Sequence, residues 1–457
     1  MKKILFTLLG CMVLASCNNE VEQMVANFEE QHDVLSVNEE GNSNVTLTDI
    51  QAYMDKGSDI ASRNGGDGEI EVITYQNDTV MYLLKYAEGW EMMPGDKRFP
   101  LRVAYNDEGT LDYANMHDAQ RAWFESMAED IHYMKNNEEY YENENSKLWN
   151  RLKERKTSLK SRTVIDGQDG WIYHNTRVVT SVKVQKDHIL GTVWHKNTPY
   201  NQFTPFELSS NSIHCSAGST AVAVGQTLNY LHTFIGTPTQ TVMTEEYDAV
   251  NRKYVFSNWS TSPWRNIAQG SDVHIARLLG HIGTLCDMEY VSWNNSYCNF
   301  QTDLIKALNT YGITATLQYS WNTDLILDNL NRNLPLLAEI RSRVIVEDKE
   351  CEEDDGSHTV TIDGYKIIDT QYTDVYIHVE DPKSYPGDIY DHDASGDPIP
   401  EEGPTRETSY TTTDVYVLFN WGYGNTDNTA YLSNSNIFYN GASYRFTDRM
   451  WYNLRKL

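Results

Sequence analysis

The segment 215-CSAGSTAVAVGQTLNYL-231 predicts a buried helix that emerges from a turn containing glycine. Its apolar side chains recur at helical spacing, at Ala221, Val224, Leu228 and Leu231. The helix is expected to begin at Ser219 or Thr220, so a hydroxyl group lies at its N-terminus. Three interpretations remain open for this segment: a hydrolase with an unusual nucleophile, a former hydrolase, or an ordinary helix of the core.

The composition indicates a large globular protein with an acidic surface. The chain has 457 residues, which is enough for two or three domains, and 40% of them are hydrophobic. Asp and Glu number 65 against 37 Lys and Arg, which gives a net charge of −28. Because this charge would repel phosphate groups, the composition argues against nucleic-acid binding.

The first 17 residues resemble a bacterial export signal. Lys2 and Lys3 precede a short apolar run, and the run ends in 14-LASC-17, which resembles a lipobox. We expect Cys17 to carry lipid and to anchor the protein in the cell envelope, at the outer membrane or cell surface; cleavage and secretion is the alternative. The polar residues 18–45 would form a tether, and no other stretch is apolar enough to span a bilayer.

Two folded units are expected after the tether. Residues 46–160 predict a small α+β unit with strands at 79–86 and 100–105 and a helix at 117–135. The basic stretch 154-ERKTSLKSRT-163 is expected to be an exposed linker or an exposed helix end. Residues 161–457 predict one large α+β domain. Its helices are expected near 219–235, 271–287 and 299–311, and its strands near 314–320, 343–347, 358–363, 373–380 and 413–420.

Three segments of the large domain carry side chains suited to nucleophilic hydrolysis. The first offers Ser219 at its helix start, and the second, 356-GSHTVTIDGYK-366, offers His358 as a base on a strand. The third, 415-VYVLFNWGYGN-425, ends a strand with Asn420, which could orient an imidazole, and Trp421, which could shield it from water. Taken singly, a strand histidine is more often structural, and Asn-Trp-Gly is usually a turn.

The cysteines leave their pairing open. Cys215, Cys286, Cys298 and Cys351 would lie in a compartment that permits disulfides, and the sequence does not choose among the three pairings. No spacing resembles a zinc site, and no cofactor or metal is expected. A shift in register that makes Cys215 the nucleophile would move it away from the helix start.

The three segments together resemble the streptopain family of papain-like cysteine peptidases, which carry an N-terminal inhibitory prodomain. The segment 215-CSAGSTAVAVGQ-226 follows the family's G-C-V-A-T-A-M-A-Q motif without a gap, and 357-SHTVTIDGY-365 follows G-H-A-W-V-I-D-G-Y. The N-W-G-W-G motif is matched by 420-NWGYG-424, and W-x-Q with P-Y-N by 194-WHKNTPYN-201. The stretch 90-WEMMPGDKRFPLRVAYNDEG-109 resembles the prodomain.

The resemblance implies a papain-like α+β fold behind a small α+β prodomain, with a cleft that binds a peptide or protein ligand. Two expected catalytic positions depart from the family: Ser219 replaces the nucleophilic cysteine, and Lys196 replaces the glutamine that donates to the oxyanion. A hydroxyl cannot form the thiolate–imidazolium pair of such sites. The expectation is therefore a catalytically impaired homologue. An active peptidase using Ser219 and His358, or a surface binding or adhesion protein on a peptidase scaffold, are the alternatives.

Overall fold

The structure is a computed structural model that describes most of the chain. The signal at 1–17, nearly all of the tether and the basic linker at 154–163 lie outside the described residues. Residues 43–153 are termed the N-terminal domain, and residues 171–457 the C-terminal domain. The described residues are 23–24, 43–56, 58, 60–61, 64, 68–113, 116, 118–137, 141–153, 171–210, 212–236, 241–260, 272–292, 296–298, 302–340, 344–346, 349–351, 358–378, 405–424, 431–433, 438–439, 442–443 and 447–457.

The N-terminal domain packs helices against an antiparallel sheet. Gln76 and Asn77 join two of its strands, and both have positive φ angles, 48° and 70°, as in a two-residue hairpin turn. Thr46 caps the first helix, because its hydroxyl oxygen accepts from the backbone amide of Asp49 at 3.3 Å, and its own amide donates to the Asp49 carboxylate at 2.8 Å. The elements are α1 (Leu47–Lys56), β2 (Glu69–Tyr75), β3 (Asp78–Lys85), β4 (Trp90–Pro94), β5 (Ala104–Asn106), α3 (Asp118–Asn137) and α4 (Glu144–Lys153), with β1 (Gln23–Met24) paired to β2.

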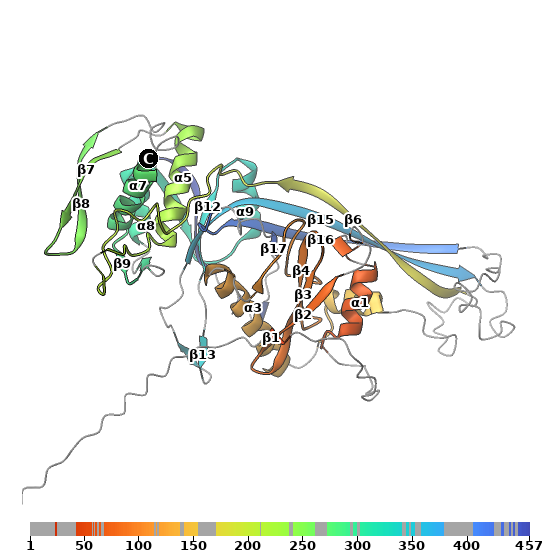
Figure 1. The fold of residues 1–457 in the computed structure, drawn as a ribbon. Helices are drawn as coiled ribbons and strands as arrows, with labels where there is room; N and C mark the ends of the chain where they lie inside the picture. The colour runs from red at the N-terminus through yellow and green to blue at the C-terminus, as the bar shows by residue number, and fades with distance from the viewer. Residues whose placement is uncertain are drawn as a thin grey trace, which may run out of the picture.

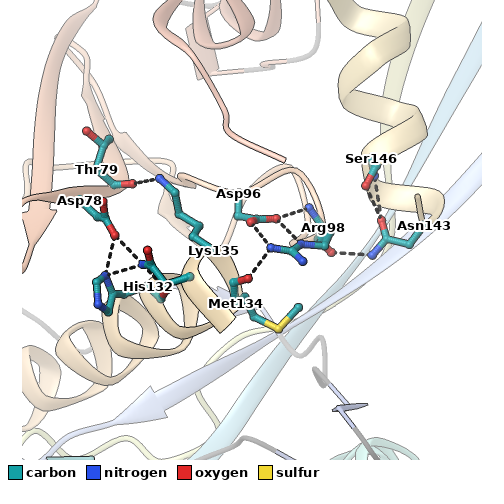
Figure 2. Close-up of polar contacts among 10 residues, drawn as sticks. Asp78, Thr79, Asp96, Arg98, His132, Met134, Lys135, Asn143 and Ser146 are labelled. Atoms are coloured by element: carbon teal, nitrogen blue, oxygen red, sulfur yellow. Dashed lines mark hydrogen bonds and ion pairs between the residues drawn. The ribbon is translucent and has the colours of Figure 1, made fainter. Parts of the chain in front are cut away.

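Polar contacts fix the C-terminal end of α3 to the strands and loop beside it (Figure 2). The buried guanidinium of Arg98 forms an ion pair with Asp96 at 2.6 Å and donates to the carbonyl oxygen of Met134 at 2.7 Å. Lys135 Nζ donates to the Thr79 carbonyl oxygen at 2.7 Å. The N-terminal domain is therefore tied together internally by desolvated charge-assisted bonds.

Helices of the C-terminal domain gather at one end of the molecule, where α5, α7 and α8 lie together (Figure 1). The predicted helix at 219–235 is confirmed as α5 (Ser219–Ile235), and those at 271–287 and 299–311 correspond to α7 (Asp272–Leu285) and α8 (Thr302–Thr310). Gly225 lets α5 and α7 approach closely, because a Cβ there would lie 2.7 Å from Leu279. The described helices also include α9 (Thr323–Asn331).

One antiparallel sheet runs through both domains. Its strand order is β1-β2-β3-β4-β5-β17-β16-β15-β12-β20-β11, and β6 also pairs with β15. The hairpin β7–β8 and the pairs β9–β10, β13–β14 and β18–β19 are separate. The strands of the C-terminal domain are β6 (Trp171–Lys186), β7 (Thr241–Asp248), β8 (Lys253–Ser260), β9 (Met288–Tyr290), β10 (Ser296–Cys298), β11 (Ile313–Gln318), β12 (Leu336–Ile340), β13 (Val344–Val346), β14 (Lys349–Cys351), β15 (His358–His378), β16 (Thr405–Asn420), β17 (Tyr431–Ser433), β18 (Phe438–Tyr439), β19 (Ala442–Ser443) and β20 (Thr447–Lys456).

The longest strand corrects one expectation. The separate strands expected near 358–363 and 373–380 are a single strand, β15, which pairs with β16 along nearly its whole length. From Tyr365 onward it also pairs with β6, and the three strands extend together as a long ribbon away from the helical end (Figure 1). Ladder bonds to two neighbouring strands hold the residues between the two expected strands in the extended conformation.

None of the described helices is both long enough and apolar enough to cross a bilayer. The described residues also contain no group of His, Cys, Asp and Glu that could hold a metal ion.

Candidate active site

Gly218 sets the entry to α5, the helix that carries the nucleophile position. Its φ of 82° is one that residues with a Cβ rarely adopt, and a Cβ there would lie 2.2 Å from the Met288 side chain. The helix begins at the next residue, so Ser219 stands among the unsatisfied amide groups of the helix N-terminus. The structure therefore places Ser219 at the predicted position, with 8% of its surface exposed.

The first turn of α5 is fastened to the start of β15. The backbone amide of Thr359 donates to Ser219 Oγ at 3.1 Å. The hydroxyl groups of Thr220 and Thr359 lie 2.8 Å apart. His358 directly precedes Thr359, so the base position lies one residue from the amide that donates to Ser219. The hydroxyl of Ser219 serves here as an acceptor in a tie between a helix and a strand.

Lys196 also lies beside this junction. Its carbonyl oxygen accepts a hydrogen bond from the amide of Ala217 at 2.7 Å, two residues before the nucleophile position. Its side chain is largely buried, and the ammonium lies 4.9 Å from the centre of the Tyr423 ring. A cation over an aromatic face is favourable when both are desolvated. The residue at the expected oxyanion-donor position is thus a lysine engaged with an aromatic ring.

Asn420 connects three segments around the site. Its Oδ1 accepts from Gln226 Nε2 at 3.1 Å and from the amide of Gly422 at 3.2 Å, and its Nδ2 donates to the Thr192 carbonyl oxygen at 3.3 Å. Gln226 in turn accepts from the amide of Trp194 at 3.0 Å. These bonds join α5, the end of β16 and the chain that leads to Lys196.

The predicted shield, Trp421, lies inside the apolar core. It is 2% exposed and meets Phe419 edge to face, with ring centroids 5.2 Å apart. Its cluster includes Val360 and Ile362 of β15, the strand that begins at His358. The wall behind the site is therefore a packed apolar layer.

Sequence reasoning missed the structural roles of Gln226 and Asp363. Both coincide with family motif positions, which was the available signal, but a motif does not say what a side chain contacts. Asp363 is fully buried; one carboxylate oxygen lies 2.6 Å from His188 Nδ1, and the other accepts from the amide of Leu190 at 3.2 Å. Burial raises the pKa of Asp363, and His188 opposes that shift. The pair ties β15 to the segment that leads to Lys196.

Cys215 is placed as a core thiol. It is 1% exposed and forms no disulfide, and burial raises the pKa of its thiol to about 11. Cys215 lies four residues before the helix start, and its carbonyl oxygen accepts from the Thr204 hydroxyl at 2.6 Å. A thiol in this state is a poor nucleophile at neutral pH, because the thiolate is the reactive form.

Comparisons with known proteins bear on the same region. Residues 194–380 match the model of the Peptidase C10 family, a span that includes Lys196, Ser219 and His358. A comparison with curated proteins gives no match.

Two solved structures from Prevotella intermedia are similar to the chain. A prointerpain A fragment is 14% identical, with a TM-score of 0.47, and the match covers 84% of this chain and 98% of that one. Active interpain A cysteine protease is 16% identical, with a TM-score of 0.35, and the match covers 60% of this chain and 95% of that one. The family model, together with a helix start fastened beside the histidine strand, agrees with the papain-like α+β fold expected from the sequence. Over residues 194–380, the chain is therefore similar to the Peptidase C10, or streptopain, family.

Proposed function

We propose that the protein is a catalytically impaired streptopain-family homologue that binds a peptide or protein segment beside Ser219. The observation that carries the proposal is the state of the Ser219 hydroxyl, which accepts the Thr359 amide at 3.1 Å in a largely buried position. A serine nucleophile has to pass its proton to an aligned base during attack. A hydroxyl that fastens a helix to a strand is poorly placed for that step.

Lys196 supports the same proposal. Removing one oxyanion donor costs about 10²–10³ in turnover in enzymes of this chemical type. Lysine has a flexible stem, and here its ammonium lies against the ring of Tyr423. A donor in that position is not preorganised for a developing oxyanion.

The proposal also includes a place in the cell. The lipobox-like 14-LASC-17 supports a lipid anchor at Cys17 in the bacterial envelope, at the outer membrane or cell surface. The polar tether that follows would hold the folded part away from the membrane. No cofactor enters the proposal.

Peptide hydrolysis tests the catalytic part. The chain from residue 18 onward is incubated with a quenched fluorescent peptide library, alongside Ser219→Ala and Ser212→Ala. Ser212 is an exposed serine upstream of the helix and serves as the matched control. We expect all three proteins to give the same background rate. Turnover that Ser219→Ala abolishes and Ser212→Ala keeps would instead establish an active serine-dependent peptidase.

Ligand binding tests the second part. Peptides from the same library are screened by fluorescence anisotropy against the native chain, Ser219→Tyr and Ser212→Tyr. A bulky side chain at the helix start should reduce affinity at least tenfold, and the same change at the exposed serine should not. Binding of glycan or host protein that neither change affects would favour the adhesion alternative.

A further inference from the structure

Backbone pairing joins the N-terminal domain to the C-terminal domain. Strand β5 pairs with β17 through Tyr105 with Tyr431 and Ala104 with Leu432. β17 then pairs with β16, whose end carries Asn420. The edge strand of the N-terminal sheet is thereby covered by a strand from the other domain, which satisfies backbone groups that an open edge would expose.

Apolar packing crosses the same boundary. Phe124 and Ile131 of α3 are fully buried in one cluster with Val360, Ile362 and Trp421 of the C-terminal domain. Burying each large apolar side chain is worth about 1.5–3 kcal/mol. Separation of the domains would therefore uncover a contiguous apolar surface of a kind that soluble monomers rarely expose.

A second cluster extends the interface along the ribbon. Tyr53 of α1 and Trp149 of α4 are buried together with Tyr372, Tyr416 and Leu418 of β15 and β16. A cavity of about 30 Å³ also lies here, lined by Asn145 and Leu148 of one domain and by Asp414 of the other. Large aromatic side chains from both domains are nevertheless buried together, as in obligate interfaces.

Desolvated charges also cross the boundary. The guanidinium of Arg102 is buried, donates to Glu91 at 2.7 Å within its own domain, and lies 5.3 Å from the centre of the Tyr416 ring. Lys366 of β15 is 7% exposed and pairs with Asp107 across the boundary at 2.7 Å. The Asp107 side chain is 28% exposed, so the Lys366 end of the pair is the one shielded from water. Truncating a shielded charge of this kind weakens an interface.

We infer that the C-terminal domain carries a permanent docking surface for its own N-terminal domain, so that the N-terminal domain is a structural half of the mature protein and not a removable segment. The surface consists of the β17 edge, the apolar layer of Val360, Ile362 and Trp421, and Lys366. A chain cut between residues 153 and 171 remains one particle with two noncovalently held fragments. This inference is independent of whether Ser219 is catalytic.

A nicked chain tests it. A recognition sequence for a specific protease is inserted between residues 153 and 171 of the full exported chain, and the purified protein is cut to completion. Size-exclusion chromatography with mass detection, from micromolar to nanomolar concentration, should show both fragments eluting together at the mass of one chain. A C-terminal fragment that elutes without its partner, as monomer, oligomer or aggregate, overturns the inference.

A matched pair of lysine substitutions tests the surface itself. Lys366→Met keeps the side-chain stem and removes the charge that pairs with Asp107. Lys183→Met makes the same change on the exposed part of β6, where Lys183 pairs with Asp369 at 3.4 Å within the C-terminal domain. In nicked protein, Lys366→Met should raise the dissociation constant of the fragments about tenfold, and Lys183→Met should leave it unchanged. Equal effects of the two changes would contradict the assigned surface.

Discussion

The hydroxyl of Ser219 stands among free amide groups at a helix N-terminus, where a thiol would be favoured as its anion. In this chain the same position carries a neutral acceptor for the Thr359 amide. A helix N-terminus ionises a thiol far more readily than a hydroxyl, so the oxygen keeps its proton. Whether residue 219 carries sulfur or oxygen therefore decides whether its side chain is a nucleophile or the acceptor of a structural hydrogen bond.

Replacing that atom should restore reactivity before it restores turnover. Ser219→Cys is expected to react with iodoacetamide at pH 6 faster than free cysteine, because the helix N-terminus favours the thiolate. Peptide hydrolysis should stay low until Lys196→Gln is added, which should raise turnover by about 10²-fold if the amide is held in place. Alkylation kinetics and peptide hydrolysis of the single and double variants provide the measurement. A thiol at 219 no more reactive than free cysteine would show that this residue is not the nucleophile position.

Cys215 provides the opposite case four residues upstream. Burial raises the pKa of its thiol to about 11, so little thiolate exists at pH 8 in the folded protein. Native protein treated with iodoacetamide at pH 8 should keep Cys215 unmodified, and unfolding in urea should expose it to complete modification. Peptide mass mapping checks both states. Rapid modification of Cys215 in the native protein would support the alternative register in which Cys215 is the nucleophile.

At the scale of elements, α5 was predictable and the strands around it only in part. Apolar spacing and a glycine before the serine are local signals, so the helix begins at Ser219 as expected. The length of β15 depends on β6 and β16, which lie far away in sequence, and local propensity cannot report it. The hydrogen bond between Gln226 and Asn420 could not be predicted from local sequence either, because it joins α5 to the end of β16.

Helix α3 carries a carboxylate that links stability to pH. Burial raises the pKa of Glu129 from 4.5 to about 7, and the Tyr75 hydroxyl lies 3.3 Å from it. Since the folded pKa exceeds the unfolded one, the favourable contribution is complete below about pH 4.5 and is lost as the pH rises through 7. Glu129→Gln imitates the protonated form, so it should be more stable than the native chain at pH 8 by about 1–2 kcal/mol and similar at pH 4.5.

Thermal unfolding at the two pH values measures the difference. Glu88→Gln changes an exposed carboxylate of the same domain and is the control, for which no comparable gain at pH 8 is expected. If Glu129→Gln gives no gain over the native chain at pH 8, the carboxylate is not held in an unfavourable charged state.

At the scale of the whole molecule, the family resemblance and the mixed α+β class were predictable from motifs and patterning. Contact between the two domains was not, because β5 meets β17 near the opposite end of the sequence. In the candidate site, too, the residues were predictable and the contacts between distant segments were not. Ser219, His358 and Lys196 were singled out from their own motifs, whereas the bonds that join their segments, from Thr359 to Ser219 and from Ala217 to Lys196, come from tertiary packing.

The proposed lipid anchor at Cys17 makes a prediction for the whole chain. Mass spectrometry of the N-terminal peptide from the membrane fraction should show an acylated Cys17, and Cys17→Ser should move the protein out of that fraction. Two or more acyl chains are needed for stable attachment, so the modified peptide should carry more than one. A mature N-terminus at another residue, without lipid, would contradict the anchor.

The pairing of β5 with β17 also constrains the order in which the chain can fold. During synthesis, the N-terminal strands and α3 appear first, but the strand that completes their edge appears only when the chain is nearly finished. Until then the half-made protein presents an open edge and an uncovered apolar layer, the features that recruit chaperones or cause aggregation. We therefore expect truncated chains that end before residue 431 to be insoluble, although their first domain is complete in sequence.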